Sequence, residues 1–440
     1  MKMIFSPSLS RRAALAGAVL AGTIVQAQAQ PPRGPVGPPT PPPVQAPAPA
    51  PQPAPTPAPQ PAGPVAGNGG PGQIGRAGLG NALTGLTDAQ LAAFIDGRAD
   101  FRTAETVAGG LGPIFNDVSC VACHDAGGTG GASRRTVTRF GRTVNGVFDP
   151  LEHLGGSLLQ ARSINPAIRE VVPPEANTVA RRVTTPLFGA GLIDAIPDSA
   201  IVAGTLQRKP AGIAGKVSVV KDVVSGQNRI GRFGWKAQQA TLLAFAADAY
   251  LNEMGITNRF FPTENAPNGN TALLARFDRV ADIEDVADPL DGKTDVDRVA
   301  DFMRYLAAPA RGTATAASLA GEAIFNRLDC AVCHTPTMRT GRHPVAALSE
   351  KTVGLYSDLL LHDMGTLGDG IAQGTAGARD MRTAPLWGLR ARPVWLHDGR
   401  ANTVDEAVRA HAGEAQSSRV RYEALSATER TQLLAFLDTL

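Results

Sequence analysis

Hydrophobic residues recur at helical spacing in several segments between residue 86 and the end of the chain. Thr87-Asp-Ala-Gln90 and Ser426-Ala-Thr-Glu429 have the capping-box pattern of a helix start, and Thr294 begins a third helix that ends near Pro309. The last helix is expected to pack across the helix that precedes Cys330. The residues predicted to share one face are Leu91, Phe94 and Ile95 in the first helix, Val296, Val299, Phe302, Met303 and Leu306 in the second, and Leu433, Leu434, Phe436, Leu437 and Leu440 in the last.

A further helix is predicted to begin at the capping box Thr403-Val-Asp-Glu406 and to end at Gly413. Val404, Ala407, Val408 and His411 occupy positions i, i+3, i+4 and i+7, so His411 should face the core. Two interpretations of His411 fit this pattern, a hydrogen-bonded core histidine and a metal ligand.

Strand signals are sparse, and the main candidate is a hairpin in the valine-rich segment 215–224. The sequence therefore predicts a mainly α-helical protein with irregular insertions and little β-structure. The long insert between His124 and Trp235 is expected to be irregular.

The N-terminus has the order of a cleavable secretory signal over residues 1–29. Lys2, Arg11 and Arg12 precede an apolar run, and Ala27-Gln28-Ala29 follows it. The apolar run, residues 13–25, is too short to span a bilayer. We therefore expect a periplasmic or secreted protein without a transmembrane span, with an uncleaved anchor helix as the alternative.

Residues 30–77 are predicted to be a disordered linker or tail, since 17 of the 34 residues from 31 to 64 are proline. Removal of the signal would leave 39 basic and 39 acidic residues in the mature chain. This balance gives no reason to expect a nucleic-acid partner.

All four cysteines lie in two motifs of identical form, Cys120-Val-Ala-Cys123-His124 and Cys330-Ala-Val-Cys333-His334. The pattern C-x-x-C-H is typical of covalent haem c attachment, in which two thiols bond the vinyl groups and the histidine ligates the iron. A zinc ribbon or a pair of disulfides would not require a histidine after each motif. We therefore expect two haem c groups, haem 1 on His124 and haem 2 on His334.

The surroundings of the two motifs repeat as well. Ile114-Phe-Asn precedes the first motif and Ile324-Phe-Asn the second, at an offset of 210 residues. A duplicated unit is predicted, with an N-terminal cytochrome c-like domain at 78–309 and a C-terminal one at 310–440.

From about Leu86 to Leu440 the sequence resembles the superfamily of di-haem cytochrome c peroxidases and methylamine-utilisation di-haem enzymes. Within it, the chain is similar to the DUF1111 branch, which carries the label thiol oxidoreductase. Because all four cysteines are assigned to haem, the label itself receives no support. The segments that carry the resemblance are GLGPIFND, TTPLFGAGLIDAIPDSAI, GRFGWKA, YSDLLLHDMG, RTAPLWGL and HDGRANTVDEAVRAHAGEA.

The resemblance implies that His411 is the second axial ligand of haem 2. In the peroxidases this position is usually methionine, and it follows the His-Asp-Gly segment at the spacing from His397 to His411. His397 is then expected beside haem 2 but not on its iron. A histidine in place of methionine is expected to lower the reduction potential.

For haem 1 the resemblance implies that Trp235 relays electrons between the haems and that Glu253 is the distal acid–base residue. From the residues alone, Glu253 fits equally well as a solvated side chain at a helix end, and Trp235 as a core residue. His153 is either a sixth ligand of haem 1 or a surface histidine. His362 and Met364 are expected to pack near haem 2.

Together these features predict an exported di-haem c-type cytochrome that acts as a peroxidase-like oxidoreductase. Haem 2 would accept electrons from a small periplasmic protein, and haem 1 would reduce peroxide or act on an unknown small substrate. The alternative is an electron-transfer cytochrome without catalytic activity, in which both irons carry two protein ligands.

Overall fold

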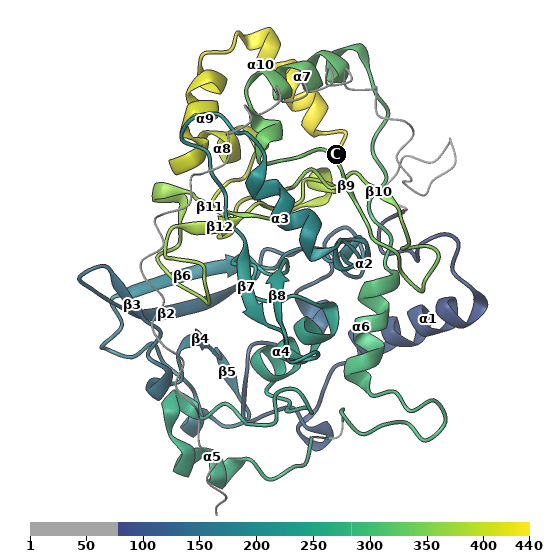
Figure 1. Cartoon of the computed structure of the whole chain (residues 1–440). Helices are drawn as coiled ribbons and strands as arrows, with labels where there is room; N and C mark the ends of the chain where they lie inside the picture. Colours follow the sequence, from purple (N-terminus) through teal and green to yellow (C-terminus); the bar gives the residue numbers. More distant parts are fainter. Residues whose placement is uncertain (1–77, 283) are drawn as a thin grey trace, which may run out of the picture. The chain divides into compact units, whose positions relative to one another are not determined.

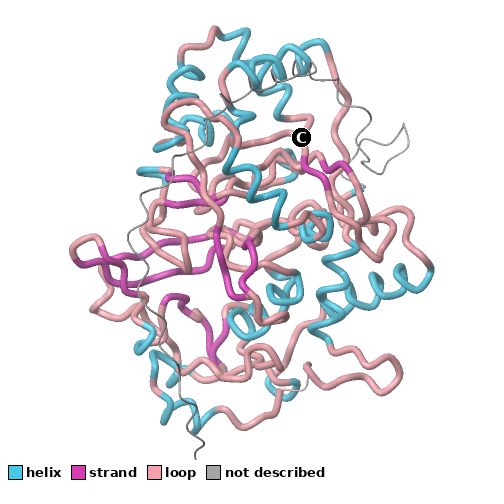
Figure 2. Tube along the Cα trace, viewed as in Figure 1, coloured by secondary structure: helices cyan, strands magenta, loops and turns pink. Residues whose placement is uncertain are grey.

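The computed structural model describes residues 78–282 and 284–440, and Figure 2 shows helices, strands and long loops interspersed throughout them. The predicted signal peptide and the proline-rich segment lie outside the described residues. The α-helices are α1 (Asp88–Arg102), α2 (Ala190–Asp194), α3 (Asp198–Leu206), α4 (Leu242–Met254), α5 (Thr271–Phe277), α6 (Asp295–Tyr305), α7 (Ala316–Arg327), α8 (Val404–Arg409), α9 (Gln416–Glu423) and α10 (Ala427–Leu437).

The strands form small antiparallel sheets, of which the largest has four strands. In it, β2 pairs with β3, β4 and β6, while β1 pairs with β5, β7 with β8, β9 with β10 and β11 with β12. The bounds are β1 (Ile114–Phe115), β2 (Thr136–Val144), β3 (Val147–Asp149), β4 (Ser157–Leu159), β5 (Arg162–Ser163), β6 (Thr178–Val183), β7 (Ser218–Lys221), β8 (Asn228–Gly231), β9 (Met338–Arg339), β10 (Thr352–Val353), β11 (Leu361–Asp363) and β12 (Asp380–Arg382).

This sheet corrects the prediction of an irregular insert between His124 and Trp235. Strand β2 reads TVTRFGRTV, and its burial does not alternate cleanly between apolar-in and polar-out. Two of its more buried positions, Phe140 and Gly141, are neighbours, and Arg139 beside them lines a cavity. Because the period-2 signal depends on apolar inward positions, a strand with a charged residue facing a cavity gives a weak signal.

The hairpin predicted within residues 215–224 is confirmed, since β7 pairs with β8 in the register Ser218 to Gly231. Several of its valines nevertheless face solvent. Val219 is 44% exposed, and Val223 and Val224 are each 38% exposed.

Helices α1 and α6 begin at capping boxes on Thr87 and Thr294 and pack closely against one another. A Cβ atom on Gly97 would lie 2.0 Å from the carbonyl oxygen of Arg298, so the crossing needs a glycine there. The predicted face of α6 is confirmed, but that of α1 is wrong in part. Phe94 is buried, whereas Leu91 and Ile95 are 42% and 47% exposed, because the buried positions of α1 are Phe94, Gly97 and Phe101.

The last helix, α10, packs against α7 as predicted, and Figure 1 shows the two side by side. The rings of Phe325 and Phe436 contact each other across the crossing, with centroids 5.2 Å apart and an interplanar angle of 55°. Helix α7 ends at Arg327, three residues before Cys330. The α7–α10 pair therefore fixes the position from which the second C-x-x-C-H motif starts.

Two hydrophobic clusters make up most of the core. The smaller is formed by residues between 324 and 440, and the larger includes α1, α4 and α6 together with Val345, Leu355 and Trp387. Residues from both halves of the chain thus share one core, and the described residues belong to one compact unit. The predicted boundary at residues 309 and 310 stays a prediction.

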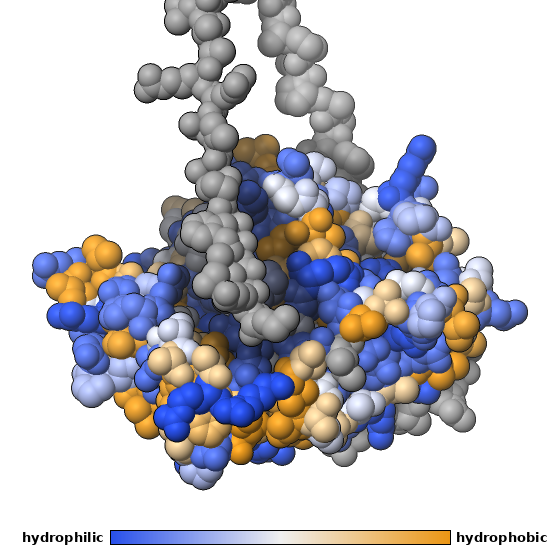
Figure 3. All heavy atoms as spheres, turned by 90° about the horizontal axis from the view of Figure 1, so that it is seen from below, coloured by the Kyte–Doolittle hydropathy of each residue, from blue (hydrophilic) through white to orange (hydrophobic). Residues whose placement is uncertain are grey.

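In the described part of the chain, no helix has the length and apolar character needed to cross a bilayer. On the face seen in Figure 3, apolar residues form separate patches between hydrophilic ones.

Candidate haem sites

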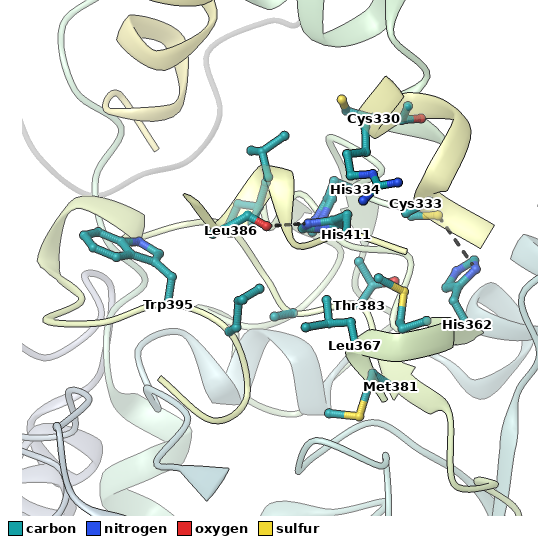
Figure 4. Close-up of a pocket in the computed structure, with 18 of the residues that line it drawn as sticks. Cys330, Cys333, His334, His362, Leu367, Met381, Thr383, Leu386, Trp395 and His411 are labelled. Atoms are coloured by element: carbon teal, nitrogen blue, oxygen red, sulfur yellow. Dashed lines mark hydrogen bonds between the residues drawn. The ribbon is translucent and has the colours of Figure 1, made fainter. Parts of the chain in front are cut away.

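The second C-x-x-C-H motif lines a cavity of about 190 Å³. Residues 330–332 form a 3₁₀ turn, which brings both thiols and His334 to the cavity wall. The two cysteines of the motif do not form a disulfide. Figure 4 shows Cys330, Cys333 and His334 on one side of this cavity with His411 beside His334.

His334 and His411 present the same ring nitrogen to the cavity. His334 donates its Nδ1 proton to the carbonyl oxygen of Tyr356 at 3.1 Å, and His411 donates its Nδ1 proton to that of Ala407 at 2.8 Å. A carbonyl only accepts hydrogen bonds, so the proton of each ring is fixed on Nδ1 and the Nε2 lone pair is left for a metal. Burial lowers the pKa of His334 to about 4, and the nearby His411 adds to the effect. The pKa of His411 is lowered by burial as well, so both rings are neutral.

The spacing of the two rings fits two ligands on one iron. Their centroids lie 6.4 Å apart with an interplanar angle of 58°. A ring centroid lies about 1.2 Å from its nitrogen and a metal–nitrogen bond is about 2.0 Å long, so the centroids of two opposed imidazoles on one ion are about 6.4 Å apart. The interpretation of His411 as only a core histidine does not account for this spacing.

The helix that carries His411 is shorter than predicted. It ends at Arg409, and Ala412 is extended, so His411 lies in the loop after α8. The predicted capping box is half formed, because Thr403 accepts from the amide of Glu406 but the carboxylate of Glu406 accepts from Asn402. The end of the helix frees the carbonyl of Ala407 for the His411 ring, since the last carbonyls of a helix lack intrahelical partners.

Three buried donors without partners line the same cavity. They are the Nε atoms of Arg392 and Arg419 and the indole nitrogen of Trp395. Leaving a buried donor unpaired costs about 1–3 kcal/mol. A haem carries two propionate groups, which are acceptors, so the donor set of this cavity fits the group that its motif predicts.

Trp235 lies between the two motifs. It lines the cavities of both, and its indole nitrogen donates to the carbonyl oxygen of Val183 at 2.8 Å. His397 packs edge-on against it with ring centroids 6.2 Å apart, and also lines the second cavity. Burial lowers the pKa of His397 to about 4. Trp235 is buried, as a core residue would be, but its position is also that expected of a relay.

The first C-x-x-C-H motif lines a larger cavity, of about 420 Å³. His124 donates its Nδ1 proton to the carbonyl oxygen of Gly131 at 3.1 Å, and burial lowers its pKa to about 4. Its Nε2 is thereby left for a metal, as in His334. Arg139 and Arg182 line this cavity; Nε of Arg139 is buried without a hydrogen-bond partner, whereas Arg182 pairs with Asp369 at 2.7 Å. The free donor of Arg139 fits a haem propionate in this cavity too.

Glu253 lies in the last turn of α4 and lines the first cavity, so it is not a solvated side chain. Its Oε2 accepts a hydrogen bond from Nδ2 of Asn116 at 2.9 Å. Burial raises the pKa of the carboxyl group, and the opposing effects of Arg139 and Asn116 do not cancel it.

Most polar residues of the first cavity were not predicted from the sequence, among them Arg139, Gln238 and Asp248. Asp248 is one helical turn and a half before Glu253, and burial raises the pKa of its carboxyl group too. An arginine in a strand or a glutamine in a turn gives no signal that separates a cavity residue from a surface one.

His153 does not reach the first cavity. It lies in a surface 3₁₀ turn, residues 152–154, and its side chain is exposed. Of the two alternatives for His153, the structure supports the surface histidine and not the sixth ligand. Among the described residues that line this cavity, His124 is the one histidine. Met254 and Met303 line it too, as members of the larger hydrophobic cluster.

His362 and Met364 line the second cavity, which agrees with the prediction that they pack near haem 2. His362 is 2% exposed and bonds Asp358 and Glu414. Burial favours the neutral ring, but hydrogen bonds to Asp358, Cys333 and Glu414 outweigh it and raise the pKa of His362 to about 11. The imidazole is thus held as a cation.

A protein-family model described as "Di-haem oxidoreductase, putative peroxidase" matches residues 171–440, more than half of the chain. A comparison with curated proteins gave no match. Similar solved structures include hydrazine synthase of Kuenenia stuttgartiensis, with 13% identity over 88% of this chain and 100% of that one at a TM-score of 0.37. The diheme peroxidase BthA of Burkholderia thailandensis has 13% identity over 79% and 86% of the two chains at 0.30, and a MauG-like protein associated with microbial copper homeostasis has 17% over 58% and 89% at 0.30.

Proposed function

This chain belongs to the di-haem oxidoreductase family, and on that basis we propose that it is a peroxidase-like enzyme with two covalently bound haem c groups. Each C-x-x-C-H motif holds one haem, in one of two cytochrome c-like domains. Trp235, which lines both cavities, would carry electrons from the haem of the second cavity, reduced by a small donor protein, to the haem of the first, where the substrate would be reduced. The observation that carries this proposal is the difference between the two cavities.

In the second cavity His334 and His411 would both hold the haem iron. Two such ligands would exclude a substrate from the iron, and two imidazoles favour the ferric state more than an imidazole and a thioether do. Such a site suits electron transfer. The smaller volume of this cavity agrees with that role.

The first cavity takes the same cofactor but is more than twice as large, 420 Å³ against 190 Å³. Besides His124, this cavity has the carboxyl group of Glu253 rather than a second histidine. A haem bound here would supply electrons to the substrate. A small molecule such as peroxide would lie in this cavity beside Glu253.

Glu253 acts as the acid–base residue. Reduction of hydrogen peroxide to two waters takes two electrons and two protons, and a proton must move from the near to the far oxygen before the O–O bond breaks. Asn116 holds Oε2 of Glu253, which leaves Oε1 to accept and return that proton. The raised pKa of the buried carboxyl group brings it closer to the working pH of an acid–base catalyst.

We further propose that the protein is exported through its N-terminal signal and works in the periplasm or outside the cell. Covalent haem attachment through C-x-x-C-H motifs and the signal-like residues 1–29 support this location. The electron donor would be a small redox protein of the same compartment.

Spectroscopy and turnover of the purified holoprotein test the proposal. Acid–acetone extraction should leave both haems on the chain, and the spectra should contain one low-spin haem and one haem that changes on adding peroxide. Glu253→Gln should slow peroxide reduction by about 10²-fold or more, as expected for an acid–base residue. Glu175→Gln, at an exposed glutamate of the same half, is the matched control. Two low-spin haems whose spectra do not change on adding peroxide would instead support the electron-transfer cytochrome.

A further inference from the structure

The loop that carries His411 is fixed by a residue three positions further on. Glu414 accepts hydrogen bonds with both carboxylate oxygens, although α8 has already ended at Arg409. The donors are Nδ1 of His362 at 2.7 Å, the amides of Ala214 and Gly215 at 2.9 and 3.1 Å, and the amide of Asp363 at 3.2 Å.

His362 is the centre of this arrangement. Its second ring nitrogen bonds Asp358 at 3.0 Å, and Asp358 also pairs with Lys209 at 3.4 Å. Its Nδ1 lies 3.7 Å from the sulfur of Cys333, the contact drawn as a dashed line in Figure 4. One buried side chain thus connects the haem 2 attachment motif, the loop after α3 and the loop that carries His411.

Two glycines let these segments approach closely. A Cβ atom on Gly215, at φ +71°, would lie 2.7 Å from Cε1 of His362. A Cβ atom on Gly413, at φ +59°, would lie 2.1 Å from the carbonyl oxygen of Asp363. Any other residue would be strained at both positions and would push the loops apart.

The other local contacts of His411 do not fix its loop to the rest of the protein. Its ring and its amide bond the carbonyls of Ala407 and Val408, both at the end of the same short helix. Helix α8 has only six residues, and such a helix is stable only through its tertiary contacts. The four bonds of Glu414 are the contacts that hold this loop against residues 214–215 and 362–363.

We propose that Glu414 is a positioning residue that, clamped by His362 and the backbone of residues 214–215, holds His411 on haem 2. The proposal rests on the proposed function, because it assumes that His411 is an axial ligand. It makes the ligand set of haem 2 depend on a loop from the N-terminal half of the chain. A break in the clamp frees the loop and lets His411 leave the iron.

The test compares the holoprotein variants Glu414→Ala, Glu414→Gln and His362→Gln with wild type. Carbon monoxide binds only where a ferrous iron has an open position. The rate of its binding to reduced haem 2 therefore measures the fraction of molecules in which His411 is dissociated from the iron. Glu414→Ala should raise that rate about tenfold, equivalent to about 1.4 kcal/mol, and Glu414→Gln by less, since an amide oxygen still accepts from the backbone amides. His362→Gln should also raise it, and the ferric low-spin signal of haem 2 should weaken in parallel.

Glu423→Gln is the matched control, because Glu423 is exposed at the end of α9. Haem content and thermal unfolding of each variant separate loss of the clamp from loss of the fold, and the more conservative Glu414→Gln serves if Glu414→Ala does not fold. His411→Ala provides the reference for a missing ligand. If His411→Ala opens haem 2 and the Glu414 and His362 variants bind carbon monoxide at the wild-type rate, the clamp is refuted while the ligand assignment stands. If His411→Ala itself changes nothing, the ligand assignment fails first.

Discussion

Replacing Gly321 by alanine should disturb haem 2 without touching its cavity. Gly321 lies where α7 crosses α10, and a Cβ atom there would lie 2.0 Å from the carbonyl oxygen of Gln432 and 2.8 Å from Cβ of Phe436. A carbon atom needs about 3.5 Å to such neighbours, so the two helices would have to separate by more than about 1 Å. Because α7 leads into Cys330, that displacement reaches the second haem motif.

The expected magnitude follows from two opposing effects. Overpacking costs about 1–3 kcal/mol, and the upper part of that range, about 2–3 kcal/mol, applies here because a backbone carbonyl cannot rotate away as a side chain can. Alanine favours the helix over glycine by about 1 kcal/mol. The free energy of unfolding should therefore fall by roughly 1–2 kcal/mol. The displaced motif should also weaken the match between His334 and His411, and so the low-spin signal of haem 2.

Denaturant unfolding followed by haem absorbance and far-ultraviolet circular dichroism measures the first effect, and electron paramagnetic resonance of the ferric protein measures the second. Gly78→Ala is the control, since a Cβ atom at Gly78 meets nothing within 4 Å. Unfolding of Gly321→Ala at the wild-type denaturant concentration would refute the close crossing. A loss of stability with an unchanged haem 2 signal would refute the transmission from α7 to the motif.

Three further changes test the sites. His411→Met should keep haem 2 low-spin and raise its reduction potential by on the order of 0.1 V. Spectroelectrochemistry measures the potential, and an equal or lower value would count against His411 as the ligand. Arg419→Met removes a positive charge from the second cavity and should lower the same potential by on the order of tens of millivolts, whereas no shift would place Arg419 away from the propionates. Burial raises the pKa of Glu253 above 4.5 in the folded protein, so the folded state binds the extra proton. The free energy of unfolding should therefore fall as pH rises from 4.5 through the folded pKa of Glu253. Glu253→Gln should remove this contribution to the pH dependence. Denaturant titrations that give the same pH dependence for wild type and Glu253→Gln would contradict the prediction.

The sequence predicted those parts of the molecule whose signals are local. A C-x-x-C-H motif needs only five neighbouring residues, and the cap of α10 needs only Ser426 and Glu429, so neither depends on tertiary contacts. The end of α8 was predicted too late because Gly413 looked like a C-cap, whereas its positive φ serves the contact with Asp363. That contact joins residues 50 positions apart, and no local pattern contains it.

The first cavity was harder to predict for a physical reason. Its polar residues come from strand β2, a turn and helix α4, and each of them is unremarkable in its own segment. Arg139 interrupts the apolar pattern of its strand because the strand faces a cofactor cavity rather than a hydrophobic core.

The position of His411 followed from helical spacing and from the resemblance to known di-haem enzymes, because it needed only one amphipathic helix beside one haem motif. The role proposed for Glu253, by contrast, depends on its hydrogen bond with Asn116, which lies 137 residues away in the sequence. The two cavities therefore differ in predictability because their linings differ. Residues 325–437 form most of the second cavity, with Ile213 and Trp235 added, whereas the first is assembled from separate segments between residues 101 and 303.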